Sequence, residues 1–250
     1  PKNDKSTRAA TLSILADTHL SLADTTTALT DLDAAILLEP EESNYLMQRA
    51  NLYYETGNYD LSDDDYERVA QLDKDNFNPY MGLGRNAMAR EDYDRAVTFF
   101  DRVVQLAPEF NYGYSYRAEA HLLRRDYPHA VEDCTSALSL LWDDVDVRAY
   151  QVFRTLCDSA ATTLRARLKV LHNKEPQKQK WLYYLYTLED HLGNYGRAAN
   201  YYFKEYQLSP TAQSALNLAD KLASLNLHDA ALMWQARAEN HDSKNIDAPL

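Results

Sequence analysis

The chain has 250 residues, of which 45% are hydrophobic and 26% are charged, and its formal net charge at pH 7 is −12. This length allows a large buried core, and the acidic charge argues against general nucleic-acid binding, which requires a basic surface. Only six glycines, and no run of alternating β-branched residues, argue against a sheet protein. No stretch is long and apolar enough to predict a membrane span, and two cysteines do not make a disulfide framework.

Residues 80–108 predict two helices folded back on each other, and the chain repeats this unit every 34 residues. One series with this step contains proline at four positions, in a chain with only eight prolines. Its members are Pro40, Lys74, Pro108, Trp142, Pro176 and Pro210. Small residues keep the same step at Ala16, Ala50, Gly84 and Ala118. A fixed period of this length is typical of stacked helical repeats.

The first two units occupy about residues 9–40 and 43–74. The turn between the two helices is poorly marked in the first unit, whereas a Gly57-Asn58 pair marks it in the second. The second unit then carries three successive aspartates at residues 63–65. This run lacks the oxygen spacing and the glycine of a calcium loop, so we interpret it as an exposed helix face.

The third unit, about residues 77–108, carries the pattern most completely, with Tyr80, Leu83, Gly84, Ala96, Phe100 and Pro108 in order. This order resembles the tetratricopeptide repeat family, whose pattern is W-x2-L-G-x2-Y…A-x3-F…P over 34 residues. Ala87 replaces the family tyrosine, and the second unit departs from the pattern at Arg49 and Ser62. The resemblance covers most of the chain. It implies an all-α, right-handed α-solenoid of about seven stacked helix–turn–helix units.

The later units keep the spacing with one weak member. The fifth unit, about residues 145–174, is degenerate because Val152 and Leu164 replace the small residues, so we expect a splayed pair there. The sixth unit recovers the pattern, and the seventh fits with a slip of one residue. The expected regions are residues 9–142 (units 1–4), 143–177 (the degenerate fifth pair), 178–242 (units 6 and 7) and a loose tail, 243–250.

The sequence shows no catalytic motif such as a glycine-rich phosphate loop, HExxH, CxxC or GxSxG. We therefore predict that the chain is not an enzyme and holds no cofactor or metal. Cys134 replaces a ring of the repeat pattern, which favours a buried thiol over a reactive one. His121 and His129 are eight residues apart across a predicted turn, so the two can approach each other, but the sequence identifies no further ligand.

The family resemblance implies that the first helix of each pair lines a concave groove holding an extended peptide or a partner's helix. The corresponding positions here are Asn44, Met47, Asn51, Tyr54, Asn78, Met81, Arg85, Met88, Tyr112, Ser115, Glu119 and Leu122. Methionine and tyrosine give an adaptable lining, and asparagine pairs with a bound backbone; the alternative is that these residues only fill helices. Family members that bind acidic chaperone tails need a cluster of cations. Arg85 stands nearly alone, which disfavours that partner.

A basic run interrupts the acidic chain in and after the fifth unit, at Arg165, Arg167, Lys169, Lys174, Lys178 and Lys180. We hypothesise that it docks an acidic partner or a second copy of the chain. The alternative is a solvated helix face.

Together these observations predict a non-catalytic scaffold or adaptor that binds a peptide or partner protein in its groove, without nucleic acid and without inserting into a membrane. The alternative is a regulatory or bacterial envelope-assembly protein whose catalytic or targeting part lies outside these residues. The chain begins at Pro1 and not at Met, so we expect an upstream segment, which includes the case of a signal peptide. The compartment stays open between the cytoplasm and a bacterial periplasm.

Overall fold

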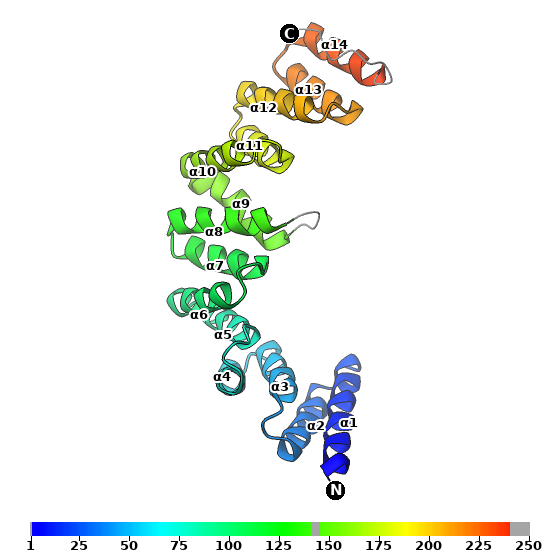
Figure 1. Ribbon diagram of the computed structural model, residues 1–250, viewed down its shortest axis with the longest axis vertical. Coiled ribbons are helices and arrows are strands. Elements are labelled where there is room, and N and C mark those ends of the chain that lie inside the picture. Colours follow the sequence, from blue (N-terminus) through cyan, green and yellow to red (C-terminus); the bar gives the residue numbers. More distant parts are fainter. Residues whose placement is uncertain (1, 142–145, 241–250) are drawn as a thin grey trace. The chain divides into compact units, whose positions relative to one another are not determined.

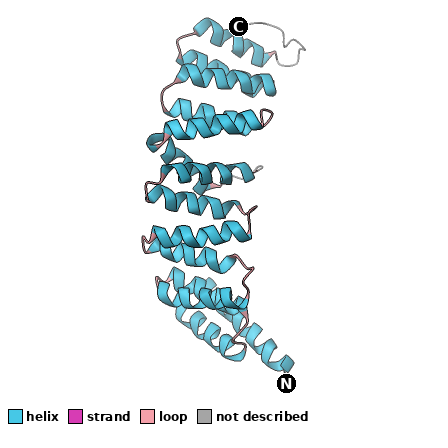
Figure 2. Cartoon of the chain, turned by 60° about the vertical axis from the view of Figure 1, so that its left-hand side comes forward, coloured by secondary structure: helices cyan, strands magenta, loops and turns pink. Residues whose placement is uncertain are grey.

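The computed structural model describes residues 2–141 and 146–240, which form fourteen α-helices and no strand (Figures 1 and 2). The helices are α1 (Lys2–Ser21), α2 (Thr25–Leu38), α3 (Ser43–Glu55), α4 (Tyr59–Leu72), α5 (Asn78–Ala89), α6 (Tyr93–Leu106), α7 (Asn111–Leu123), α8 (Tyr127–Leu140), α9 (Val147–Ser159), α10 (Ala161–Lys174), α11 (Gln179–His191), α12 (Tyr195–Leu208), α13 (Ala212–Ser224) and α14 (His228–Glu239). The predicted all-α class is confirmed. Trp142 of the proline series and the expected tail at 243–250 lie outside the described residues.

The chain divides into an N-terminal unit, residues 1–152, and a C-terminal unit, residues 153–250, with the boundary inside α9. In the N-terminal unit, consecutive helices from α1 to α8 pack against each other. In the C-terminal unit, consecutive helices from α10 to α14 do the same. Each unit is therefore built from helical hairpins in chain order, because a hairpin buries its remaining apolar face only against its neighbour.

The turns inside the hairpins share a backbone conformation. The described residues with positive φ are Ala23, Gly57, Glu91, Arg125, Gly193 and Asn226. The first five lie on one series with the 34-residue step, and Asn226 falls one residue short of it, where the seventh unit was expected to slip. Ser159, the member of this series in the fifth unit, is not among them. The unit that is degenerate in sequence thus also lacks the shared turn.

Helix α5 touches its neighbours on both sides through glycines. A Cβ atom on Gly84 would lie 2.3 Å from the Phe100 ring of α6, and one on Gly82 would lie 2.2 Å from the Tyr66 ring of α4. Both rings are buried, and so is Ala96, which belongs to the same buried cluster as Phe100. The small residues of the repeat therefore let large rings fill the space where the helices cross.

Two arginines join successive hairpins in the same way. Arg49 of α3 donates to both carboxylate oxygens of Asp65 in α4, at 2.8 and 2.7 Å, and to Asp33 of α2, at 2.6 Å. Two repeats further along, Arg117 of α7 makes the same bonds to Asp133 of α8, at 2.7 and 2.6 Å, and to Asp101 of α6, at 2.7 Å. Each guanidinium therefore ties its own hairpin to the preceding one.

The interpretation of residues 63–65 as an exposed face was wrong for two of the three aspartates. Asp65 is buried against Arg49, and Asp63 pairs with Arg90 at 2.8 Å and accepts from Asn86 at 2.7 Å. Only Asp64 is exposed. Arg49 lies 16 residues before Asp65 and Arg90 lies 27 residues after Asp63, and no pattern within the run itself indicates such partners.

Candidate functional site

A cleft of about 480 Å³ lies in the N-terminal unit. Most of its wall comes from the first helices of the hairpins, α3, α5 and α7, together with the start of α9. The lining residues are Tyr54, Arg85, Met88, Ala89, Glu91, Tyr93, Tyr116, Glu119, Leu123 and Arg148. Helices α3 and α5 contact each other, and α3, α5, α7 and α9 all contribute side chains to this one cleft.

Two arginine–tyrosine stacks stand in this cleft. The guanidinium carbon of Arg85 lies 4.1 Å from the centroid of the Tyr54 ring, and that of Arg148 lies 3.8 Å from the centroid of the Tyr116 ring. In each stack the two residues come from different first helices. A guanidinium on an aromatic face keeps its charge and leaves its N–H groups able to donate to a further molecule.

The two arginines differ in what else they contact. Arg148 also forms an ion pair with Glu119, whereas Arg85 forms none with any residue that the structure describes. The Arg85 charge also acts on Tyr66, whose phenol donates to Asn51 Oδ1 at 2.6 Å. Burial raises the pKa of Tyr66 to about 12, and Arg85 opposes that rise. Arg85 thus stands in the cleft without an ion-pair partner among the described residues, although Glu91 and Glu119 also line the cleft.

Four of the twelve predicted groove residues line this cleft: Tyr54, Arg85, Met88 and Glu119. Three others, Asn44, Asn78 and Tyr112, are exposed at or near the start of their helices. The remaining predicted residues take structural roles. Met47 and Met81 pack against buried clusters, Leu122 is half-buried, and Asn51 accepts the Tyr66 hydrogen bond.

Ser115 has to be removed from the predicted groove. It is completely buried, and its hydroxyl donates to the backbone oxygen of Tyr112 at 3.2 Å. The neighbouring Tyr116 lines the cleft in its place. Adjacent residues on a helix point about 100° apart around its axis. Two steps of 34 residues from Met47 lead to Ser115, which is one residue away from the side chain that lines the cleft.

Sequence reasoning also missed Arg148, Tyr93 and Leu123. Arg148 belongs to the fifth unit, which matches the repeat pattern too poorly for groove positions to be assigned from it. A usable signal was present. Both arginine–tyrosine stacks join a tyrosine of one first helix to an arginine of the next, at separations of 31 and 32 residues.

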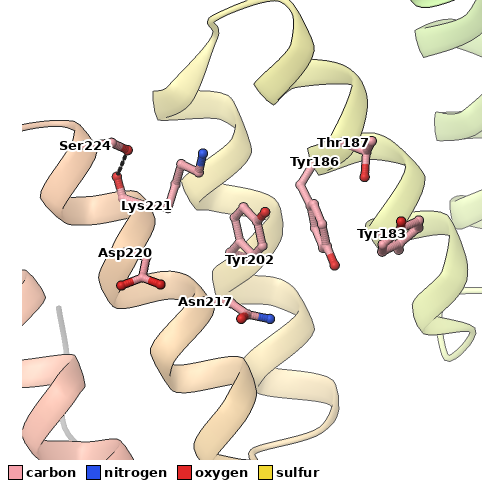
Figure 3. A pocket seen from close by; sticks show the side chains of 8 residues that line it. All are labelled: Tyr183, Tyr186, Thr187, Tyr202, Asn217, Asp220, Lys221 and Ser224. Carbon is pink, nitrogen blue, oxygen red and sulfur yellow. Dashed lines mark hydrogen bonds between the residues drawn. The ribbon is translucent and has the colours of Figure 1, made fainter. Parts of the chain in front are cut away.

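A second cleft of about 480 Å³ lies in the C-terminal unit and was not predicted (Figure 3). Its walls are formed by Tyr183, Tyr186, Thr187, Tyr202, Asn217, Asp220, Lys221 and Ser224, from α11, α12 and α13. The Tyr186 and Tyr202 rings stack with their centroids 3.9 Å apart. Lys221 Nζ lies 2.7 Å from a carboxylate oxygen of Asp190, which also accepts from the Tyr202 hydroxyl at 3.0 Å. Burial raises the pKa of both stacked tyrosines, so both stay protonated near neutral pH.

The predicted basic run is not a uniform surface. Arg165 donates to the buried carboxylate of Glu189 at 2.5 and 3.2 Å, and Lys178 pairs with Glu175 at 2.6 Å. Lys169 and Lys174 are exposed. Arg165 therefore contributes to the interior of the C-terminal unit, and a charge reversal there would disturb folding before it tested docking. Arg167 and Lys180 are partly buried.

Among the described residues, no helix is long and apolar enough to cross a membrane.

Comparison with known proteins agrees with this architecture. The tetratricopeptide repeat model matches residues 15–79 and 81–145, which together make up more than half of the chain. The chain belongs to the tetratricopeptide repeat family, whose members are generally protein-binding scaffolds and not catalysts. No curated protein matches the chain.

Three solved structures illustrate the likeness of fold. A tetratricopeptide repeat protein from Parabacteroides merdae is 16% identical with a TM-score of 0.56, covering 96% of this chain and 95% of its own. PilF of Pseudomonas aeruginosa is 16% identical with a TM-score of 0.52 and the same coverage. MamA from Desulfovibrio magneticus is 16% identical with a TM-score of 0.50, covering 81% of this chain and 96% of its own.

Proposed function

We propose that this chain is a non-catalytic scaffold that binds an extended peptide segment of a partner protein in the cleft of the N-terminal unit. The observation that carries the proposal is the pair of arginine–tyrosine stacks formed by Tyr54 with Arg85 and by Tyr116 with Arg148. They line one cleft and come from successive hairpins. Such a cleft suits a ligand that runs across several repeats.

The chemistry of the lining defines the peptide. The tyrosine faces, Met88 and Leu123 offer apolar contact, while Arg85 offers a guanidinium that forms no ion pair with a described carboxylate. Bidentate donation to a carboxylate is the contact that a free guanidinium makes best. We therefore expect a segment with one acidic side chain or a terminal carboxylate beside an apolar residue. A run of acidic residues fits less well, because Arg148 already forms an ion pair with Glu119 and so does not offer a second free cation.

Peptide display tests this proposal without knowledge of the natural partner. Random twelve-residue peptides are selected on the wild-type chain, and the affinity of the enriched peptides is then measured for variants. Arg85→Ala should weaken binding by at least about tenfold, since a hydrogen bond to a charged group contributes roughly 1.5–3 kcal/mol.

Arg95→Ala is the matched control. Arg95 also lies over an aromatic ring, that of Phe99 at 5.6 Å, but on the second helix of its hairpin and outside the cleft. This variant should bind the selected peptides as the wild type does. Equal binding to the Arg85 and Arg95 variants, or no enrichment of peptides on the wild type, would contradict the proposal.

A further inference from the structure

Two histidines and an aspartate meet at the turn between α7 and α8. His121 lies in the last turn of α7, Asp126 immediately precedes α8, and His129 lies in the first turn of α8. Asp126 Oδ2 is 2.8 Å from His129 Nδ1 and 3.4 Å from His121 Nδ1. The two rings stack with centroids 5.1 Å apart. One ligand atom from each of the three residues lies within 4.8 Å of the others.

His121 supplies an independent sign that a ligand binds here. His121 is only 8% exposed, and its Nδ1 atom has no hydrogen-bond partner among the described residues. Buried polar atoms in folded proteins nearly always have a partner, so each exception requires a cause. This nitrogen lies on the Asp126 side of the ring, where a shared ion would bind.

A second carboxylate lies beside the other nitrogen of the His121 ring. Asp133 Oδ2 lies 3.8 Å from His121 Nε2, and Arg117 holds Asp133 in place through two hydrogen bonds. A negative group beside Nε2 favours the tautomer with its proton on that nitrogen, which leaves a lone pair on Nδ1, the nitrogen that lies 3.4 Å from Asp126. In metal sites the second nitrogen of a ligating histidine commonly donates to a carboxylate; Asp133 lies on that side of the His121 ring, beyond hydrogen-bond distance.

We propose that His121, Asp126 and His129 form a site for a divalent transition metal, with zinc as the best fit. Two imidazole nitrogens and one carboxylate oxygen are the donor set of zinc sites that keep a fourth position open for water. Magnesium and calcium prefer oxygen ligands alone. The ion would clip α7 to α8 at the turn that joins them.

The distances are compatible with this ion. With bonds of about 2.0–2.1 Å, the donors of a tetrahedral zinc site lie roughly 3.4 Å apart. The His121–Asp126 separation is 3.4 Å. The His129–Asp126 separation of 2.8 Å is that of a hydrogen bond. It widens by only about half an ångström when the proton on His129 Nδ1 leaves to solvent and the metal takes its place.

Isothermal titration of zinc chloride into the full chain tests the proposal. The protein carries no affinity tag, has been freed of metal with a chelator, and is kept reduced because Cys134 and Cys157 are free thiols. We expect one zinc ion per chain. His129→Gln and Asp126→Asn should each weaken binding by at least about tenfold, since even outer partners of a metal site cost that much. The His129 side chain is 64% exposed, so that variant keeps the fold, which circular dichroism verifies.

The matched control is His191→Gln. His191 Nε2 also contacts a carboxylate, that of Asp158 at 2.6 Å, but this pair does not belong to any described cluster of three ligands. Zinc affinity should be unchanged in this variant. Cobalt gives a second readout, because four-coordinate cobalt absorbs visible light strongly, and the absorption should appear with the wild type and disappear in His129→Gln. Absence of saturable binding by the wild type, or equal zinc affinity of the His129 and His191 variants, would overturn the proposal.

Discussion

At the scale of single residues, the two carboxylates that hold Arg49 are not equivalent, because their burial differs. The side chain of Asp65 is 7% exposed, whereas that of Asp33 is 55% exposed. An exposed ion pair adds little to stability, since water screens it. A buried carboxylate is different, because removing it leaves a desolvated charge without a partner. The hydrogen bonds of Asp65 raise the pKa of Arg49, so the guanidinium stays charged at every pH the fold withstands.

We therefore predict that Asp65→Ala lowers the free energy of unfolding by about 2–4 kcal/mol, slightly less than for a fully buried pair because Arg49 keeps some exposure. The third unit has Leu83 and Phe99 at the positions of this pair. The double variant Arg49→Leu/Asp65→Phe should therefore recover most of the loss. Denaturation of Arg49→Leu, of Asp65→Phe and of the double variant in guanidinium chloride measures the coupling between the two positions.

The control for this cycle is Asp33→Ala, which should cost less than about 1 kcal/mol because the pair is exposed. Equal losses for Asp33→Ala and Asp65→Ala would show that burial does not decide the value of these contacts. If the double variant lost as much free energy of unfolding as its two single variants together, the buried pair would have no coupling, which would also contradict the prediction.

These contacts also show what a sequence reveals at this scale. Arg49 stands out because it departs from the repeat pattern, yet its partners lie 16 residues away in each direction on other helices. No local pattern marks such a pair, and the aspartates of the acidic run look alike in sequence. Burial separates Asp65 from Asp64, and burial depends on how the hairpins pack.

At the scale of elements, the turns show packing overriding local preference. Gly57 and Gly193 suit a left-handed backbone, but Ala23, Glu91 and Arg125 adopt the same positive φ. For residues with a Cβ atom this conformation costs roughly 1–2 kcal/mol. The packing of the helices compensates for that cost. The sequence consequently predicts the spacing of the turns and marks their conformation only where glycine is present.

Ala23→Gly should therefore raise the free energy of unfolding by about 1 kcal/mol, because relief of the left-handed strain exceeds the added entropy of the unfolded chain. The reverse change, Gly57→Ala, should lower it by a similar amount. A Cβ atom at Gly57 meets nothing within 4 Å, so the cost is conformational and not steric. Thermal melting of both variants checks the opposite signs, and a shift in the same direction for both would refute the argument.

The candidate cleft, like the turns, could be predicted from the sequence only in part. The repeat pattern places Tyr54, Arg85, Met88 and Glu119 on the first helices, and these residues do line the cleft. The pattern does not contain Arg148, which comes from the degenerate fifth unit. Periodicity thus predicts which helices form a surface. The departures from periodicity decide which side chains give that surface its charge.

At the scale of the whole molecule, the boundary between the two compact units falls in the one hairpin that lacks both the small residues and the shared turn. It lies between Val152 and Phe153, within α9. In repeat proteins, stability is approximately a sum of terms from each repeat and from its contacts with its neighbours. Where the contacts between two neighbouring repeats are weak, the parts of the chain on either side of them can unfold independently.

We therefore predict two unfolding transitions in guanidinium. The C-terminal unit contains the buried Trp181 and Trp234, so tryptophan fluorescence reports that unit once Trp142 is replaced by phenylalanine. Circular dichroism reports the helices of both units, and the two signals should have different midpoints.

Phe100→Ala should cost about 3–5 kcal/mol in the N-terminal unit and leave the fluorescence midpoint unchanged. Leu164→Ala, in the C-terminal unit, should cost about 2–5 kcal/mol and lower the fluorescence midpoint. If each variant shifted both signals equally, the two units would unfold as one cooperative body.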